Sequence, residues 1–194
     1  MASATGAPPA EQAVAATGVV AQQAASVAHG IRRRVLDHVL RYGEGYLSQA
    51  CSAAELLATL YTAILQLGPA LGPPVPPPFS GTPGPGRPGW QGGQYNGAKT
   101  AATDRFFFSP VHYALVLYAT LVETGRLAAE GLADFNRDGG TVEMIGAEHS
   151  PGIETTAGSL AQALSVAGGV ALARKLRGDS GRVWVFMSDG EFQE

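Results

Sequence analysis

The residues whose types and spacing best suit chemistry are Ser188, Asp189 and Gly190, which follow a run of five apolar residues at positions 183–187. Such a run, bounded by a charged residue and a small-residue turn, predicts a strand buried on both faces. Strands of this kind belong to parallel sheets flanked by helices, and ligands bind beyond their carboxyl ends. Asp189 lies at such an end, where a carboxylate suits a magnesium ion that also binds phosphate oxygens.

The elements upstream of this strand predict an α/β fold. Residues 105–108 favour a short buried strand, and Pro110 suits the first position of the helix that follows. A long helix is expected to begin at Gly158 or Ser159 and to end at Gly178. Its inward face is expected to carry Leu160, Leu164, Ala167, Val170 and Ala171. The alternation of strands and helices is typical of a mostly parallel sheet.

The N-terminal half predicts helices and one long loop. Residues 1–28 are expected to form a tail or a weak helix, and an amphipathic helix is expected from Ile31. Ser52 and Glu55 have the spacing of a capping box, which predicts that the next helix begins there. Residues 68–97 are dominated by Pro and Gly and predict an exposed insertion with polyproline character. Docking to a proline-recognition module is the alternative use of this loop.

Four segments carry motifs that occur together in one family. Residues 188–194 resemble Gly-Asp-Gly-x-x-x-Glu, with Ser188 at the first Gly, and residues 151–160 resemble Pro-Gly-Val-Glu-x-x-x-Gly-x-Leu, with Ile153 at the Val. Residues 104–112 match Asp-Arg-Phe-x-x-Ser-x-Gly-His, and residues 52–57 match Ser-Ala-Ala-Asp/Glu-Ile/Leu-Leu. From about residue 31 onward the chain therefore resembles the N-terminal thiamine diphosphate-binding domain of the transketolase family.

The resemblance implies a three-layer thiamine diphosphate-binding fold over residues 29–194, incomplete in this sequence, with the Pro/Gly-rich insertion at 68–97. It implies thiamine diphosphate and Mg²⁺ as cofactors, with Asp189 as the metal ligand. Gly158 and Gly190 would allow close approach of the backbone to the cofactor, and Leu160 would supply an apolar wall. The cofactor-binding positions implied by the resemblance are His112, Gly158, Ser159, Leu160, Asp189 and Gly190.

The catalytic positions implied by the resemblance are His112, Tyr46 and Glu194. His112 would accept or relay a proton near the reacting carbon, although Val111 stands where the family has Gly. Glu194 matches a Glu that pairs across the family's dimer interface. Alternatively, His112 packs as a structural residue and Glu194 is merely solvated.

The main departure from the family lies in the substrate pocket. Tyr46 occupies the place of a sugar-binding His, and a phenol with an ordinary pKa near 10 is a poor base at neutral pH. The family's second loop His falls near Ile145, while His149 is offset from that place. We therefore expect a substrate pair other than xylulose 5-phosphate and ribose 5-phosphate.

The resemblance implies a transferase subunit that moves a two-carbon ketol unit between sugar or sugar phosphate substrates. The glutamate that activates the cofactor's aminopyrimidine would lie in a second, pyrimidine-binding half, on later sequence or on a separate subunit, so a homo- or hetero-oligomer is expected. One alternative is another thiamine diphosphate enzyme, either a 2-oxo acid dehydrogenase component or a deoxyxylulose phosphate synthase. The other is a non-catalytic chain that binds a partner subunit.

Composition narrows the function classes further. The net charge of −3 and the pI near 5.8 provide no basic footprint for nucleic acid. No apolar run reaches the length of a membrane span, and the N-terminus lacks the features of a signal peptide. Cys51 is the single cysteine, which excludes an internal disulfide, and we expect it to be a buried small side chain. A cytoplasmic protein is expected.

Overall fold

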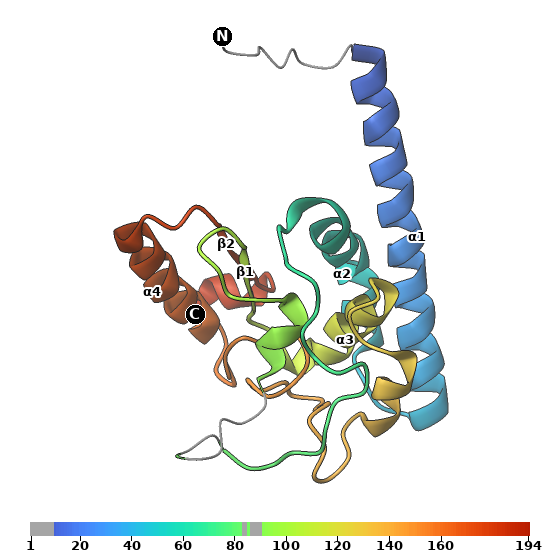
Figure 1. Ribbon diagram of the computed structural model, residues 1–194. Coiled ribbons are helices and arrows are strands. Elements are labelled where there is room, and N and C mark those ends of the chain that lie inside the picture. The colour runs from blue at the N-terminus through green and yellow to red at the C-terminus, as the bar shows by residue number, and fades with distance from the viewer. Residues whose placement is uncertain (1–9, 83–84, 86–90) are drawn as a thin grey trace.

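The computed structural model describes residues 10–82, 85 and 91–194, with side chains from Thr17 onward. Its regular elements alternate between helices and two short strands (Figure 1). In chain order they are α1 (Ala10–Tyr42), α2 (Leu47–Thr59), β1 (Arg105–Phe108), α3 (Ala114–Glu123), α4 (Gln162–Arg177) and β2 (Val183–Phe186). Among the described residues the chain is thus a mixed helix and strand structure with few strands.

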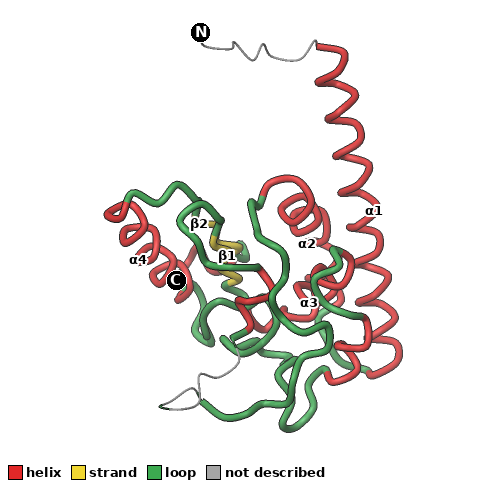
Figure 2. Tube along the Cα trace, viewed as in Figure 1, coloured by secondary structure: helices red, strands yellow, loops and turns green. Residues whose placement is uncertain are grey.

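The two strands pair in parallel, with Arg105 opposite Val183 and Phe108 opposite Phe186. This pairing confirms both predicted strands and the predicted parallel sheet. The strands lie between α4 and the helices α2 and α3 (Figure 2). The side chains of β1 are mostly buried, whereas all four residues of β2 are only half-buried. The prediction that β2 is buried on both faces is therefore wrong for the described part of the chain, because β1 is its only neighbouring strand there.

The core joins α1, α2 and α3 to one face of the sheet. Ile31, Val35, Leu57 and Leu117 are fully buried in it, and Phe106 of β1 belongs to the same cluster. The N-terminal half of α1 projects beyond the rest of the molecule (Figure 1), and the side chains of residues 17–23 are exposed. Among the α1 side chains that the structure describes, those buried in the core therefore lie in its C-terminal half.

The start of α2 differs from the prediction. The helix begins at Leu47, so Ser52 lies within it and donates its hydroxyl hydrogen to the carbonyl of Gln49. The prediction of a capping box is wrong, because the buried face of the helix already includes Ala50 and therefore needs an earlier start. Glu55 forms an ion pair with Arg32 of α1 instead of capping the helix. Cys51 is exposed, so the prediction that it is buried is also wrong.

The predicted end of α4 is confirmed, since Gly178 follows the helix with a positive φ of 75°. The residue at which α4 begins and the face that it buries differ from the prediction. The helix begins at Gln162, and the buried residues are Ala163, Ala167 and Arg174. Leu160, Leu164 and Ala171 are exposed. Arg174 determines which face of α4 is buried, because its buried guanidinium donates to the carbonyls of Ala101 and Thr103 beside β1.

The proline-rich part of the loop after α2 is tied to the body of the protein. The carbonyl of Pro73 accepts a hydrogen bond from the Tyr95 hydroxyl at 2.7 Å, and that of Pro74 accepts one from the Ala128 N–H at 2.8 Å. The carbonyl of Pro77 accepts a third from the Thr141 hydroxyl at 2.9 Å. Part of the predicted insertion, residues 83–84 and 86–90, lies outside the described residues, as do residues 1–9 of the predicted tail.

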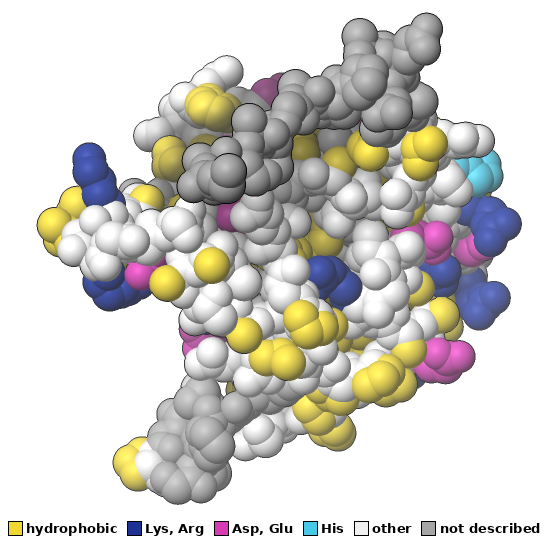
Figure 3. All heavy atoms as spheres, turned by 45° about the horizontal axis from the view of Figure 1, so that its top comes forward, with side chains coloured by type: hydrophobic (Ala, Val, Ile, Leu, Met, Phe, Trp, Pro, Cys, Tyr) yellow, Lys and Arg dark blue, Asp and Glu magenta, His cyan; other side chains and the backbone are white. Residues whose placement is uncertain are grey.

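Charged side chains cover only part of the molecular surface (Figure 3). On the face shown in Figure 3, charged side chains of both signs lie at the right-hand edge and, in a smaller group, at the left, and much of the remainder is apolar or uncharged. In the described part of the chain, no helix combines the length and the apolar character needed to cross a membrane.

Candidate functional site

A cleft of about 410 Å³ opens between α2 and the carboxyl end of β2. A volume of this size is typical of cofactor and small-molecule sites. Polar and apolar side chains both line it. The lining residues are Ser48, Gln49, Ser52, Ala53, Leu56, Tyr113, Phe186, Met187, Ser188 and Asp189. The cleft therefore lies where a parallel sheet is expected to bind ligands.

Asp189 reaches this cleft because of the way β2 ends. The strand stops at Phe186, and a short 3-10 helix begins at Gly190, which leaves Asp189 exposed at the edge of the cleft. Among the described residues, no three His, Cys, Asp or Glu side chains come together as metal ligands. One carboxylate at the mouth of a cleft fits Mg²⁺, because this ion is commonly held by one or two carboxylates with phosphate oxygens and water.

The predicted glycine positions leave room for a ligand. A Cβ atom added at Gly158 or at Gly190 would meet no atom of the protein within 4 Å. Packing within the described chain therefore does not require glycine at either position, and the open space is compatible with close approach of a diphosphate. Ser159 and Leu160 are also exposed, but neither lines the cleft.

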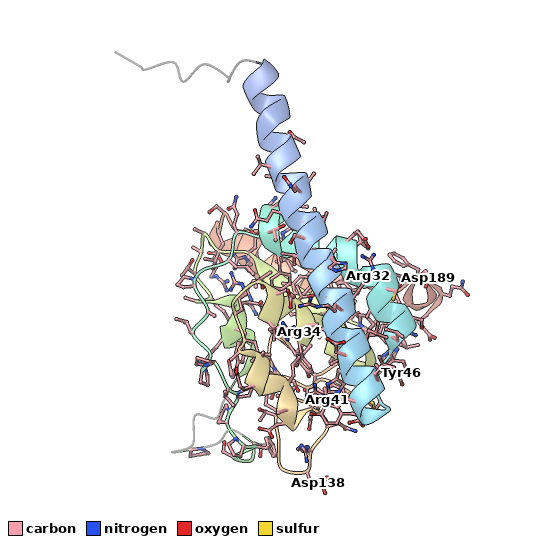
Figure 4. All side chains as sticks on the ribbon, turned by 90° about the vertical axis from the view of Figure 1, so that its right-hand side faces the viewer. Arg32, Arg34, Arg41, Tyr46, Asp138 and Asp189 are labelled. Atoms are coloured by element: carbon pink, nitrogen blue, oxygen red, sulfur yellow. The ribbon has the colours of Figure 1, made fainter. Side chains whose placement is uncertain are left out.

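Three aromatic rings cluster beside the cleft. The Tyr46 ring lies 6.0 Å from the His112 ring and 5.4 Å from the Tyr113 ring, measured between centroids. Tyr113 also lines the cleft, and Figure 4 labels Tyr46 and Asp189 on the same side of the molecule, near α2. The structure therefore brings Tyr46 and His112 together, next to the cleft that contains Asp189.

A buried carboxylate that the sequence analysis did not single out joins the loops around the cleft. Glu191 is 2% exposed and accepts hydrogen bonds from Ser109, Ala161 and Ser188. Burial opposes its ionisation, but these hydrogen bonds outweigh burial and hold the pKa of the Glu191 carboxyl below its ordinary value. The sequence signal that could have revealed it is weak, because it is only a Glu beside Asp189, the residue predicted to bind a metal.

Other predicted positions lie apart from the cleft. Glu194 is exposed and does not line it. His149 packs its ring 4.6 Å from that of Phe79, in a separate small cavity. The Glu154 side chain is buried and pairs with Arg105 at the start of β1. The structure therefore places none of Glu194, His149 and Glu154 in the lining of the cleft.

Comparison with known proteins identifies the family of this chain. Residues 94–194, just over half of the chain, match the family model described as the thiamine diphosphate binding domain of transketolase. The chain belongs to the transketolase family. The matched region contains β1, the cleft-lining Tyr113 and the whole stretch from α4 to Asp189.

Relatives within the transketolase family extend the similarity to most of the chain. An uncharacterised transketolase family protein of Sinorhizobium fredii is 34% identical over 84% of this chain and 50% of its own length. The 6-deoxy-6-sulfo-D-fructose transketolase subunit of a Clostridium species is 28% identical, over 86% of this chain and 52% of its own. An apulose-4-phosphate transketolase subunit of Phocaeicola vulgatus is 26% identical, over 82% and 48%. The chain thus spans about half the length of these curated relatives.

Proposed function

We propose that this chain is the diphosphate-binding part of a transketolase-type transferase that moves a two-carbon ketol unit between sugar or sugar phosphate substrates. The observation that carries the proposal is the position of Asp189, in a cleft at the carboxyl end of a parallel strand, within the region that matches the family's cofactor-binding domain. Thiamine diphosphate, when bound, supplies the electron sink for this chemistry, and the protein supplies binding and orientation.

The proposed cofactor site uses residues on three segments. Asp189 holds Mg²⁺ at the end of β2, while Gly190 and the turn of Gly158 and Ser159 let the backbone approach the cofactor. Leu160 offers an exposed apolar side chain for contact with the cofactor. The larger fold that we propose is the three-layer fold of the family, of which the described strands and helices form a part.

The proposed substrate site is the aromatic cluster of Tyr46, His112 and Tyr113. His112 holds or moves a proton at a ring nitrogen, and the Tyr46 hydroxyl donates a hydrogen bond to the substrate. A phenol cannot replace an imidazole as a base near neutral pH, so we propose a ketose other than the usual pentose phosphates. Two relatives whose names specify 6-deoxy-6-sulfo-D-fructose and apulose-4-phosphate support a substrate outside that usual pair.

We further propose that a pyrimidine-binding half, as a separate subunit or on further sequence, completes the site in an oligomer, with Glu194 near the interface. The support is that two relatives are named as subunits of transketolases. A cytoplasmic location is part of the same proposal.

The test is the variant Asp189→Ala in the full-length chain together with the pyrimidine-binding half. We expect magnesium-dependent binding of thiamine diphosphate, measured by calorimetry, to be abolished, because the ion loses its protein carboxylate. Asp138→Ala is the control, since Asp138 is also exposed and lies well apart from Asp189 (Figure 4). Unchanged affinity in the Asp189 variant would refute the assignment. Carbon transfer from ketose donors, compared with decarboxylation of 2-oxo acids, tests the reaction class.

A further inference from the structure

The carboxylate of Glu191 occupies an unusual position, two residues after Asp189 but directed into the protein. Its oxygen Oε1 accepts the Ser109 hydroxyl at 2.6 Å and the Ala161 N–H at 3.0 Å. Its oxygen Oε2 accepts the Ser188 N–H at 2.7 Å and the Ser188 hydroxyl at 3.0 Å. Four donors therefore surround one buried side chain, and each comes from a segment beside the cleft or the proposed cofactor turn.

The donors belong to segments that are distant in sequence. Ser109 follows β1, Ser188 follows β2, and Ala161 precedes α4. Ser188 also lines the cleft, directly before Asp189. Glu191 is thus the point at which the ends of both strands and the turn before α4 are joined.

The turn before α4 depends on such a contact. Ala161 has a φ of 60°, a left-handed conformation that a residue with a Cβ rarely adopts. The same turn carries Gly158, Ser159 and Leu160, which are exposed, and one hydrogen bond within it joins the Gln162 N–H to the Ser159 carbonyl. The hydrogen bond from the Ala161 N–H to Glu191 is an anchor at the C-terminal end of this turn.

We propose that Glu191 is a positioning residue, which holds the metal-binding Asp189 and the 158–161 turn in a fixed relation before the cofactor binds. This inference rests on the proposed function, in which both segments hold one cofactor. Groups that orient metal ligands from behind commonly govern metal affinity, because the ligands then need no reordering on binding.

A carboxylate is required because all four surrounding groups donate. An amide has one acceptor oxygen and an NH₂ group that only donates. In Glu191→Gln, the NH₂ group would face either the N–H of Ala161 or the N–H of Ser188. One backbone N–H would lose its acceptor in either orientation, so one of the two segments would be released.

Asp104 provides a matched control at the opposite end of the sheet. Its carboxylate is also buried and also accepts four hydrogen bonds, from Gln66, Trp184 and two groups of Arg182. It lies before β1, whereas Glu191 follows β2. Asp104→Asn therefore damages a comparable network without touching the proposed cofactor site.

The experiment compares Glu191→Gln, Asp104→Asn and the unchanged protein, each as the full-length chain with the pyrimidine-binding half. Calorimetry gives the Kd of thiamine diphosphate at saturating Mg²⁺ and the Kd of Mg²⁺ at saturating cofactor. Hydrogen exchange without cofactor reports the amides of residues 158–162 and 188–190. We expect Glu191→Gln to weaken both affinities about 10- to 100-fold and to speed exchange in these two segments. Asp104→Asn should lower the melting temperature and leave both affinities within about threefold.

Several outcomes would overturn the inference. Unchanged affinities in Glu191→Gln would do so, and so would faster exchange spread evenly over the chain, which indicates a purely structural role. If Glu191→Gln does not fold, Glu191→Asp decides through the same measurements, because the shorter carboxylate cannot keep the hydrogen bonds to both the Ala161 N–H and the Ser188 N–H. If the unchanged protein binds no thiamine diphosphate, the proposed function fails. Faster hydrogen exchange in Glu191→Gln that is confined to residues 158–162 and 188–190 would then still support the role of Glu191 as an anchor, and its absence would contradict that role.

Discussion

The substitution Asp104→Asn tests how much the polar network at the start of the sheet stabilises the fold. The Asp104 side chain is fully buried. Oδ2 accepts the Gln66 N–H at 3.1 Å, and the Arg182 guanidinium and the Trp184 indole at 3.0 Å each. Oδ1 accepts the Arg182 N–H at 2.8 Å. This one side chain therefore links Arg182, the residue before β2, to Gln66 in the loop after α2.

The expected cost follows from these contacts. An Asn oxygen at the Oδ2 position keeps three donors, but its NH₂ group then faces the N–H of Arg182. A buried donor without an acceptor costs about 1–3 kcal/mol. The Arg182 side chain is 49% exposed, so the lost charge attraction adds at most about 1 kcal/mol. We expect the free energy of unfolding to fall by about 3 kcal/mol.

Urea unfolding of the full-length chain measures this change, with Asp138→Asn as the control. Asp138 is exposed, so its substitution should change the free energy of unfolding by less than about 0.5 kcal/mol. A loss below about 1 kcal/mol in Asp104→Asn would show that the site relaxes and would refute the hydrogen-bond argument.

The difference in the free energy of unfolding between Asp104→Asn and the unchanged protein should depend on pH. Burial opposes ionisation of Asp104, but hydrogen bonds from Arg182, Gln66 and Trp184 outweigh it and hold the pKa of this carboxyl below its ordinary value of 3.8. Because the folded pKa is depressed, the stability that the charge contributes is present above pH 3.8 and is lost as the pH falls through the folded value. The difference in the free energy of unfolding between the two proteins should therefore become smaller below pH 4. A constant difference from pH 7 to pH 3 would contradict the assignment.

Two further substitutions test the region of the cleft. Ala161→Gly should raise the free energy of unfolding by up to about 1 kcal/mol in urea unfolding, because glycine adopts the positive φ of 60° without strain; a decrease would show that contacts of the Ala161 methyl group outweigh the strain. Tyr46→His should increase carbon transfer between xylulose 5-phosphate and ribose 5-phosphate, measured by a coupled assay, because an imidazole can move a proton near neutral pH. Tyr46→Phe, which retains the ring and removes the hydroxyl, should not increase it. Equal activity of the His and Phe variants would argue against our substrate proposal.

The strands and their pairing could be predicted because their signals are local. A run of apolar residues bounded by turn residues defines each strand, and the family motif that follows β2 places Asp189 at its end. Gly178 also marked the end of α4 correctly, since a left-handed position after a helix favours glycine.

The errors arose where a local pattern competed with packing. Ser52 and Glu55 satisfy a capping pattern, yet burial of Ala50 extends α2 toward its N-terminus and leaves Ser52 bonded within the helix. The buried face of α4 depends on Arg174, whose carbonyl partners Ala101 and Thr103 lie more than 70 residues away in the chain. The spacing of apolar residues along α4 does not reveal these distant partners.

The role of Glu191 could not be predicted for the same reason. Its partner Ser109 is 82 residues away, and Ala161 is 30 residues away. A Glu two residues after a predicted metal ligand is equally compatible with a solvated side chain. Only the folded arrangement shows that this carboxylate is buried among donors.

The prolines at residues 73–78 have a consequence for assembly, because their backbone groups can accept hydrogen bonds but cannot donate them. Pro73, Pro74 and Pro77 have no N–H, so these residues accept hydrogen bonds from Tyr95, Ala128 and Thr141 and can donate none in return. An ordinary long insertion beside a two-stranded sheet can add itself as an extra strand, to its own chain or to a neighbouring molecule. Consecutive prolines cannot complete such a ladder. These prolines are therefore held in place without offering a template for mispairing with a neighbouring strand.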